Sequence, residues 1–96
     1  MASRVTVYGP AKDPNVKRLK REMNVMYVEY DEADVTKDAP AQRRLQDMVG
    51  GTPKLPLVEI QRSDGDGSVF LTNPDEPTLR HTLLSENILS VTAYWV

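Results

Sequence analysis

Two kinds of hydrophobic spacing alternate along the first half of the chain. In Val5–Tyr8, two valines alternate with a threonine and a tyrosine, a period of two that predicts a strand. Apolar residues then recur at helical spacing at Val16, Leu19 and Met23, which indicates a helix with one apolar face. Val25–Tyr30 returns to strand-forming residues. Because a helix separates these two predicted strands, we expect them to pair in parallel.

The second half of the chain repeats the helical spacing and then predicts a hairpin. A second amphipathic helix begins after Asp38 and ends at Gly50–Gly51, where glycine can adopt the left-handed conformation that closes a helix. Leu57–Ile60 and Ser68–Leu71 flank a turn rich in Ser, Asp and Gly, so they predict two antiparallel strands. The apolar face of the second helix consists of Ala41, Leu45, Met48 and Val49.

The helix starts share one chemistry, a capping residue followed by proline. Asp13–Pro14 opens the first helix and Asn73–Pro74 is expected to open the last. Pro77 removes an early backbone donor, so the regular part of the last helix is expected to begin nearer Thr78. The resulting order β-α-β-α-β-β-α predicts an α/β domain with a mixed four-stranded sheet flanked by helices.

Composition narrows the classes of function. The 96 residues suit a single domain, and a net charge of -2 argues against broad nucleic-acid binding. The chain has no cysteine and one histidine, so disulfide exchange and cysteine or histidine metal clusters are excluded, and we expect no metal. No apolar run approaches the roughly 20 residues of a membrane span, and no secretory signal is evident, so a cytoplasmic location is expected.

With a proline before the third strand, this order resembles the thioredoxin fold in its short, glutaredoxin-like form. Val7–Tyr8 and the basic run from Lys17 to Lys20 resemble the segment that carries the Cys-Pro-Tyr-Cys site of glutaredoxins. Leu55–Pro56 resembles the Thr-Val-Pro loop, Gly50–Gly51 the glycines ahead of it, and Asn73–Glu76 the start of the last helix. The resemblance covers about residues 4–84 of a single domain spanning 1–96, with an apolar C-terminal extension over 88–96.

The resemblance places a degenerate active site at the first helix. Asp13 stands at the position of the nucleophilic cysteine, Pro14 is retained, Asn15 replaces the tyrosine and Val16 replaces the resolving cysteine. Asp13 keeps a negative charge at the helix N-terminus, where it can cap the helix, but it cannot exchange disulfides. Capping alone and a catalytic duty are the two interpretations of Asp13, and capping is the more general one.

The glutathione contacts of the family are eroded in this sequence. Lys54 and Leu55 replace Thr and Val of the loop, and the resemblance implies that Pro56 follows a cis peptide bond. Leu71–Thr72 stand near the position of a Gly-Gly pair that contacts glutathione, and Lys12 is a candidate for binding its carboxylate. The predicted ligand groove consists of Tyr8, Lys12, Lys54, Leu55, Pro56, Leu71 and Thr72.

Other polar residues have simpler interpretations. The basic run Lys17–Arg21 is expected to be a solvated helix face, with a phosphate or partner patch as the alternative. Tyr8 and Tyr30 are expected at the sheet rim with hydrated hydroxyls, and the acidic segment Asp31–Asp34 as a solvated turn. His81 has no second ligand nearby in sequence.

Three functions remain open at this stage. The first is a redox-inactive module that binds a protein or peptide through the groove between Asp13 and Pro56. The second is an enzyme that binds or activates glutathione without thiol chemistry, with Lys12, Asp13 and Tyr8 as the suspected residues. The third is a structural domain that self-associates or docks a partner through Ile88–Val96. We expect no cofactor, and glutathione is the one candidate ligand that the resemblance suggests.

Overall fold

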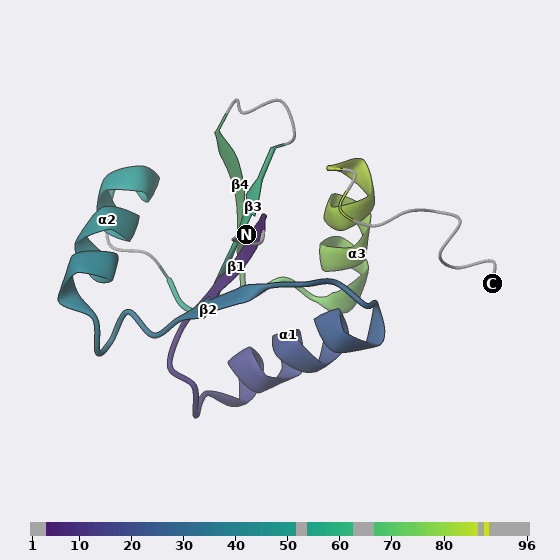
Figure 1. Cartoon of the computed structure of the whole chain (residues 1–96), viewed down its shortest axis with the longest axis horizontal. Helices are drawn as coiled ribbons and strands as arrows, with labels where there is room; N and C mark the ends of the chain where they lie inside the picture. Colours follow the sequence, from purple (N-terminus) through teal and green to yellow (C-terminus); the bar gives the residue numbers. More distant parts are fainter. Residues whose placement is uncertain (1–3, 52–53, 63–66, 87, 89–96) are drawn as a thin grey trace.

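A computed structural model describes residues 4–51, 54–62, 67–86 and 88 of the chain. The helices and strands follow the order β-α-β-α-β-β-α (Figure 1). They are β1 (Val5–Tyr8), α1 (Pro14–Val25), β2 (Asp31–Ala33), α2 (Ala39–Val49), β3 (Leu57–Gln61), β4 (Ser68–Thr72) and α3 (Glu76–Ser85). The strands form one mixed sheet in the order β2-β1-β3-β4, with β1 and β2 parallel and the other pairs antiparallel. The predicted fold class and the antiparallel pairing of the last two strands are confirmed. A parallel partner of β1 is also present, but it is formed by Asp31–Ala33 and not by the predicted residues 25–30.

The alternation along the strands divides the core into two parts. Val5 and Val7 of β1 belong to the cluster beneath α1 and α3, whereas Tyr8 belongs to the cluster beneath α2. Figure 1 shows α1 and α3 on one side of the sheet and α2 apart from them. The first cluster consists of Val5, Val7, Val16, Leu19, Met23, Met26, Val28, Val58, Ile60, Leu79 and Leu83, and the second of Tyr8, Val35, Ala41, Leu45 and Leu57.

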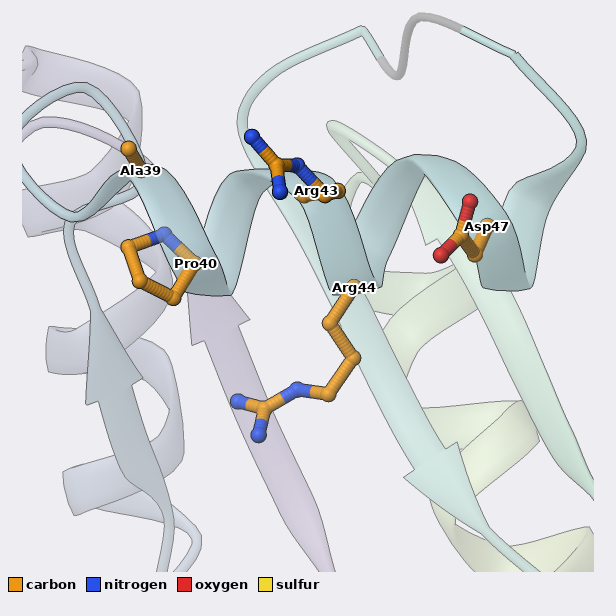
Figure 2. Close-up of a pocket in the computed structure, with 5 residues that line it drawn as sticks. All are labelled: Ala39, Pro40, Arg43, Arg44 and Asp47. Carbon is orange, nitrogen blue, oxygen red and sulfur yellow. The ribbon is translucent and has the colours of Figure 1, made fainter.

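Helix α2 buries less of its predicted apolar face than expected. Ala41 and Leu45 are buried against the sheet, but Met48 is 43% exposed. The prediction that Met48 belongs to the buried face is therefore wrong, because the helix covers only part of the strands beneath it. Figure 2 shows Arg43 and Arg44 leaving α2 in different directions, with Arg44 extending toward the strands.

Each helix is capped by an aspartate. Asp13 accepts a hydrogen bond from the Asn15 N–H at 2.7 Å, so the predicted start of α1 is confirmed. The last helix differs from the prediction, because Asp75, not Asn73, accepts the hydrogen bond from the Thr78 N–H at 2.9 Å. Helix α3 therefore begins at Glu76, and Pro77 lies in the first turn, where its missing donor costs no helical bond.

The predicted second strand is misplaced. Helix α1 continues to Val25, and Tyr27 adopts a positive φ of 58°. The Val28 N–H donates to the Met23 carbonyl at 2.9 Å, and the Tyr27 N–H donates to the Asn24 carbonyl at 3.2 Å. These two hydrogen bonds form a Schellman motif, which ends a helix with one residue in the left-handed conformation. Val28 and Met23 are buried in the same cluster and complete this ending. The strand that pairs with β1 is β2, in the acidic segment predicted to be a turn.

The C-terminal extension lies almost wholly outside the described residues. Ile88 is described, and it packs against the first core cluster. The hairpin turn over 63–66 also falls outside, so the predictions for both segments stay predictions. In the described part of the chain, no helix has the length and apolarity needed to cross a membrane.

Candidate functional site

The loop between β1 and α1 and the first turn of α1 hold the residues that the resemblance places at a thiol site. Asp13 is half-buried and caps the helix, while Pro14 and Asn15 are exposed. Val16 is only 3% exposed, and its side chain lies against Gly9. A Cβ built on Gly9 would lie 2.7 Å from Val16 Cγ2, so a side chain at position 9 would collide with Val16. Val16, which the resemblance places at the second cysteine position, thus makes a packed apolar contact.

The loop before β3 lies beside this site. Leu55–Pro56 is a cis peptide bond, as the resemblance implied. Pro56 is buried, Leu55 is half-buried and Lys54 is exposed. The same Cβ built on Gly9 would lie 3.6 Å from the Pro56 Cα and Cβ atoms. Gly9 therefore lets the α1 N-terminus and the proline loop approach each other, and we call residues 13–16 together with 55–56 the degenerate site.

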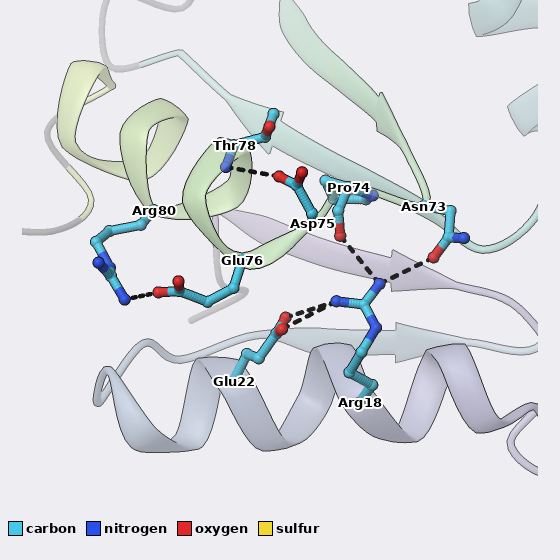
Figure 3. Close-up of polar contacts among 8 residues, drawn as sticks. All are labelled: Arg18, Glu22, Asn73, Pro74, Asp75, Glu76, Thr78 and Arg80. Carbon is cyan, nitrogen blue, oxygen red and sulfur yellow. Dashed lines mark hydrogen bonds and ion pairs between the residues drawn. The ribbon is translucent and has the colours of Figure 1, made fainter.

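Arg18 ties a third segment to this pair (Figure 3). Its Nη2 donates to Asn73 Oδ1 at 2.9 Å and to the Pro74 carbonyl at 3.0 Å, while Nη1 pairs with Glu22 at 2.9 Å. The Asn73 N–H in turn donates to the Pro56 carbonyl at 2.8 Å. Helix α1, the proline loop and the β4–α3 connection are thereby joined by one hydrogen-bonded chain, which we call the Arg18 clasp.

The clasp corrects the interpretation of the basic run. Lys17 and Arg21 are exposed, as expected of a solvated helix face. The Arg18 guanidinium is not simply solvated, because it donates the hydrogen bonds of the clasp. Lys20 forms an ion pair with Glu32 of β2 at 3.3 Å. The sequence carries no local signal for Asn73 as a partner of Arg18. Asn73 has a φ of 39°, a left-handed conformation in which asparagine is enriched.

The predicted ligand groove is only partly assembled. Leu71 is half-buried and packs against the core beneath α1 and α3, while Thr72 and Lys12 are exposed. Tyr8 is 4% exposed, and its hydroxyl donates to Glu59 Oε1 at 2.6 Å. The prediction of a hydrated hydroxyl on Tyr8 is wrong, because the phenol turns beneath α2 to a buried carboxylate.

Two aspartates, Asp75 and Asp34, accept hydrogen bonds from residues two or three positions further along the chain. The Thr78 side chain and N–H lower the pKa of Asp75, and the Thr36 hydroxyl lowers the pKa of Asp34, whose Oδ1 also accepts from the Thr36 N–H. Asp34 thus stabilises a turn. Among the residues that the structure describes, no group of three or more His, Cys, Asp or Glu side chains gathers as metal ligands would.

The site has no thiol, and its segments are joined by polar contacts. Disulfide exchange needs a thiolate nucleophile, and the chain has no cysteine. Asp13 already occupies the Asn15 N–H of the α1 N-terminus, so a second anion there would meet both a used donor and a like charge. The arrangement can therefore present backbone and side-chain surface to a ligand, but it has no thiol nucleophile at the N-terminus of α1.

Solved structures with the same architecture place the chain in a fold class. A threonine-to-alanine variant of the thioredoxin-like protein BC3987 matches with a TM-score of 0.66 and 28% identity, covering 88% of this chain and 96% of that one. A glutaredoxin from Archaeoglobus fulgidus matches with a TM-score of 0.67 and 16% identity, covering 85% and 87%. No protein-family model and no curated protein matches the sequence.

These likenesses agree with the strand order and the loop geometry described above. The chain has the thioredoxin-like fold of these two structures, and its sequence contains no cysteine. Its fold class is α/β, with a mixed four-stranded sheet and three helices in the described residues.

Proposed function

We propose that this protein is a redox-inactive, glutaredoxin-like binding module whose recognition surface is the degenerate site. The observation that carries this proposal is the Arg18 clasp, which holds the three segments around the site although the thiol chemistry is absent. A scaffold that had lost all use of this surface would have no need of a charged clasp reaching from α1 to the β4–α3 connection.

The partner we infer is a protein or peptide in extended conformation. Leu55 is half-buried beside exposed Lys54, and an extended chain could pair with backbone groups of such a loop while its side chains meet the surface. Asp13 disfavours an acidic group directly at the α1 N-terminus. Lys12 and Lys54 add positive charge further out, so a peptide with separated acidic and neutral positions is the best fit.

A peptide selection with amide mapping tests this function. Random peptides selected on the wild-type protein should shift the backbone amide signals of Asp13, Leu55 and Thr72 on titration. Leu55→Arg should weaken that binding by about tenfold or more, since it adds charge at a half-buried contact. Asp47→Asn, on the exposed side of α2, is the matched control and should leave it unchanged.

Two results would overturn the proposal. One is a set of selected peptides whose amide shifts map away from residues 13–16 and 55–56. The other is glutathione-dependent disulfide reduction above the rate of buffer. Titration with glutathione alone separates the peptide module from a glutathione-binding enzyme, because only the latter predicts shifts at Asp13 and Pro56 neighbours with the free tripeptide.

A further inference from the structure

A cavity lies on the α2 side of the sheet, apart from the degenerate site. Its volume is about 500 Å³. Tyr8 of β1 and Glu59 of β3 contribute to its lining, as do Asp31 and Glu32 of β2 together with Arg44 and Met48 of α2. It exists because α2 covers only the apolar part of this face and leaves polar side chains of β1 and β3 uncovered.

Glu59 is the unusual group in this cavity. It is 6% exposed, and its carboxylate accepts hydrogen bonds from the Tyr8 hydroxyl at 2.6 Å and the Ser68 hydroxyl at 2.7 Å. Both donors are neutral, and Glu59 takes part in none of the ion pairs formed among the described residues. Buried carboxylates are normally compensated by a cation, because desolvation of an unpaired charge is costly. Each carboxylate oxygen also keeps a lone pair for a further donor.

The other charged lining residues lie around Glu59. Asp31 and Glu32 come from β2, where Lys20 pairs with Glu32, and Arg44 of α2 contributes a guanidinium. Burial and the hydrogen bond to Glu59 raise the pKa of Tyr8, so its hydroxyl remains a donor at neutral pH. Tyr8 therefore fixes the carboxylate in place and contributes no charge of its own.

The shape of the cavity favours an elongated ligand. A second hollow of about 400 Å³ continues toward β4 and is also lined by Met48, Glu59 and Gln61, with Arg62 and Ser68 beyond them. The shared residues make the two hollows neighbours, with Glu59 common to both. Met48, exposed above this floor, offers a flexible apolar surface that suits an alkyl chain.

We propose that this cavity binds a primary ammonium group on an alkyl chain, with the ammonium donating to Glu59 and the chain lying along Met48. Such a group is carried by a free aliphatic amine or by a lysine side chain of a partner. The site is independent of the degenerate site, so failure of either proposal leaves the other standing.

Titration with matched small molecules tests the proposal directly. n-Pentylamine should shift the amide signals of Thr6, Glu59 and Gln61 at neutral pH, whereas n-pentanol, with the same chain and no charge, should not. Glu59→Gln should weaken amine binding by about tenfold or more, because it removes the charge and keeps the shape. The control Asp47→Asn removes an exposed carboxylate of α2 that does not line this cavity and should change nothing.

Arg44 gives a test in the opposite direction. Arg44→Gln removes the competing cation and should strengthen pentylamine binding by about threefold, whereas Arg43→Gln, one residue away and outside this cavity, should not. Equal shifts with pentylamine and pentanol, or no shift at millimolar pentylamine on the wild-type protein, would overturn the proposal even if Glu59→Gln failed to fold.

Two further ligands separate the sources. Cadaverine represents a free diamine, and N-acetyl-lysine methylamide represents a lysine side chain in a protein. Tighter binding of cadaverine assigns the cavity to small amines, and tighter binding of the lysine derivative assigns it to a partner protein. Binding of neither, with pentylamine also silent, contradicts the site itself.

Discussion

The two faces of the sheet differ in the size and polarity of what they bury. Beneath α1 and α3, the alternating valines of β1 and the Val58 and Ile60 side chains of β3 belong to one cluster with the leucines of α1 and α3, and every member of this cluster is apolar. Beneath α2, the apolar cluster is smaller, and a buried Tyr8–Glu59 pair lies beside it. The first face is a conventional core, whereas the second combines a core with a polar cavity.

This difference indicates which face of the sheet determines stability and which face has polar groups available for binding. The α1 and α3 face supports the degenerate site through close packing at Gly9 and Val16 and through the Arg18 clasp. The α2 face leaves charged groups partly uncovered, and these contribute little to packing. We therefore expect changes on the first face to affect stability most and changes on the second to affect binding most.

The largest effect is expected from truncation in the larger core. Leu19 and Leu45 are both fully buried. Leu19→Ala should lower the free energy of unfolding by about 4 kcal/mol, and Leu45→Ala by about 2 kcal/mol, because the smaller cluster can relax into the cavity beside it. Urea unfolding at neutral pH measures both. An equal loss for the two variants would break the comparison between the faces.

A second test concerns the close contact at the degenerate site. Gly9→Ala should cost about 2 kcal/mol, since its Cβ would meet Val16 and its φ of 155° disfavours a side chain. Adding Val16→Ala to Gly9→Ala should recover about 1 kcal/mol relative to the sum of the single variants. Gly51→Ala, with open space around it, is the control. Strict additivity would show that the two positions do not share this contact.

The Arg18 clasp should have a moderate effect. Arg18→Met keeps much of the aliphatic volume and removes the donors to Asn73 and Pro74. We expect a loss of about 1 kcal/mol in the free energy of unfolding, and little change for Lys17→Met on the exposed side of the same helix. Thermal unfolding of the pair measures the difference. Similar values for both variants would reduce the clasp to an ordinary surface contact.

The smallest effect is expected on the α2 face and appears only at alkaline pH. The raised pKa of Tyr8 means that the folded state holds this proton more tightly than the unfolded state, whose tyrosine titrates near pH 10. Its contribution to stability is thus complete below about pH 10 and is lost as pH rises above it. The urea midpoint should fall more steeply above pH 10 in the wild type than in Tyr8→Phe.

Tyr27 provides the control for this alkaline test. It is 95% exposed, so Tyr27→Phe should keep the pH dependence of the wild type. The same slope in all three proteins would contradict a role for the Tyr8 proton in folding.

Local signals made most of the fold predictable. Asp13 and Pro14 mark the start of α1 through chemistry that acts within one turn, and the spacing of Val16, Leu19 and Met23 identifies its buried face. The second strand is misplaced in the prediction because α1 ends with Tyr27 in the left-handed conformation, where glycine or asparagine is usual. The composition of residues 25–30 favours a strand, but packing of Val28 on the helix overrides it.

The site was less predictable, because its contacts join distant segments. Asp13 and Val16 could be placed through the resemblance, and Pro56 could be assigned to the adjacent loop. Nothing in the basic run distinguishes Arg18, whose partners lie 55 and 56 residues away. Glu59 did carry a signal, a charged residue within an otherwise apolar strand, but its partners Tyr8 and Ser68 come from separate strands.

The outer strand β2 has a consequence for the behaviour of the protein at high concentration. It is three residues long, and its Asp31 and Glu32 side chains are exposed at the edge of the sheet. An extended segment of another molecule would have to approach these carboxylates before its backbone could pair with β2. Short, charged edge strands of this kind oppose edge-to-edge pairing between the sheets of different molecules, so β2 protects the protein from aggregation on that side.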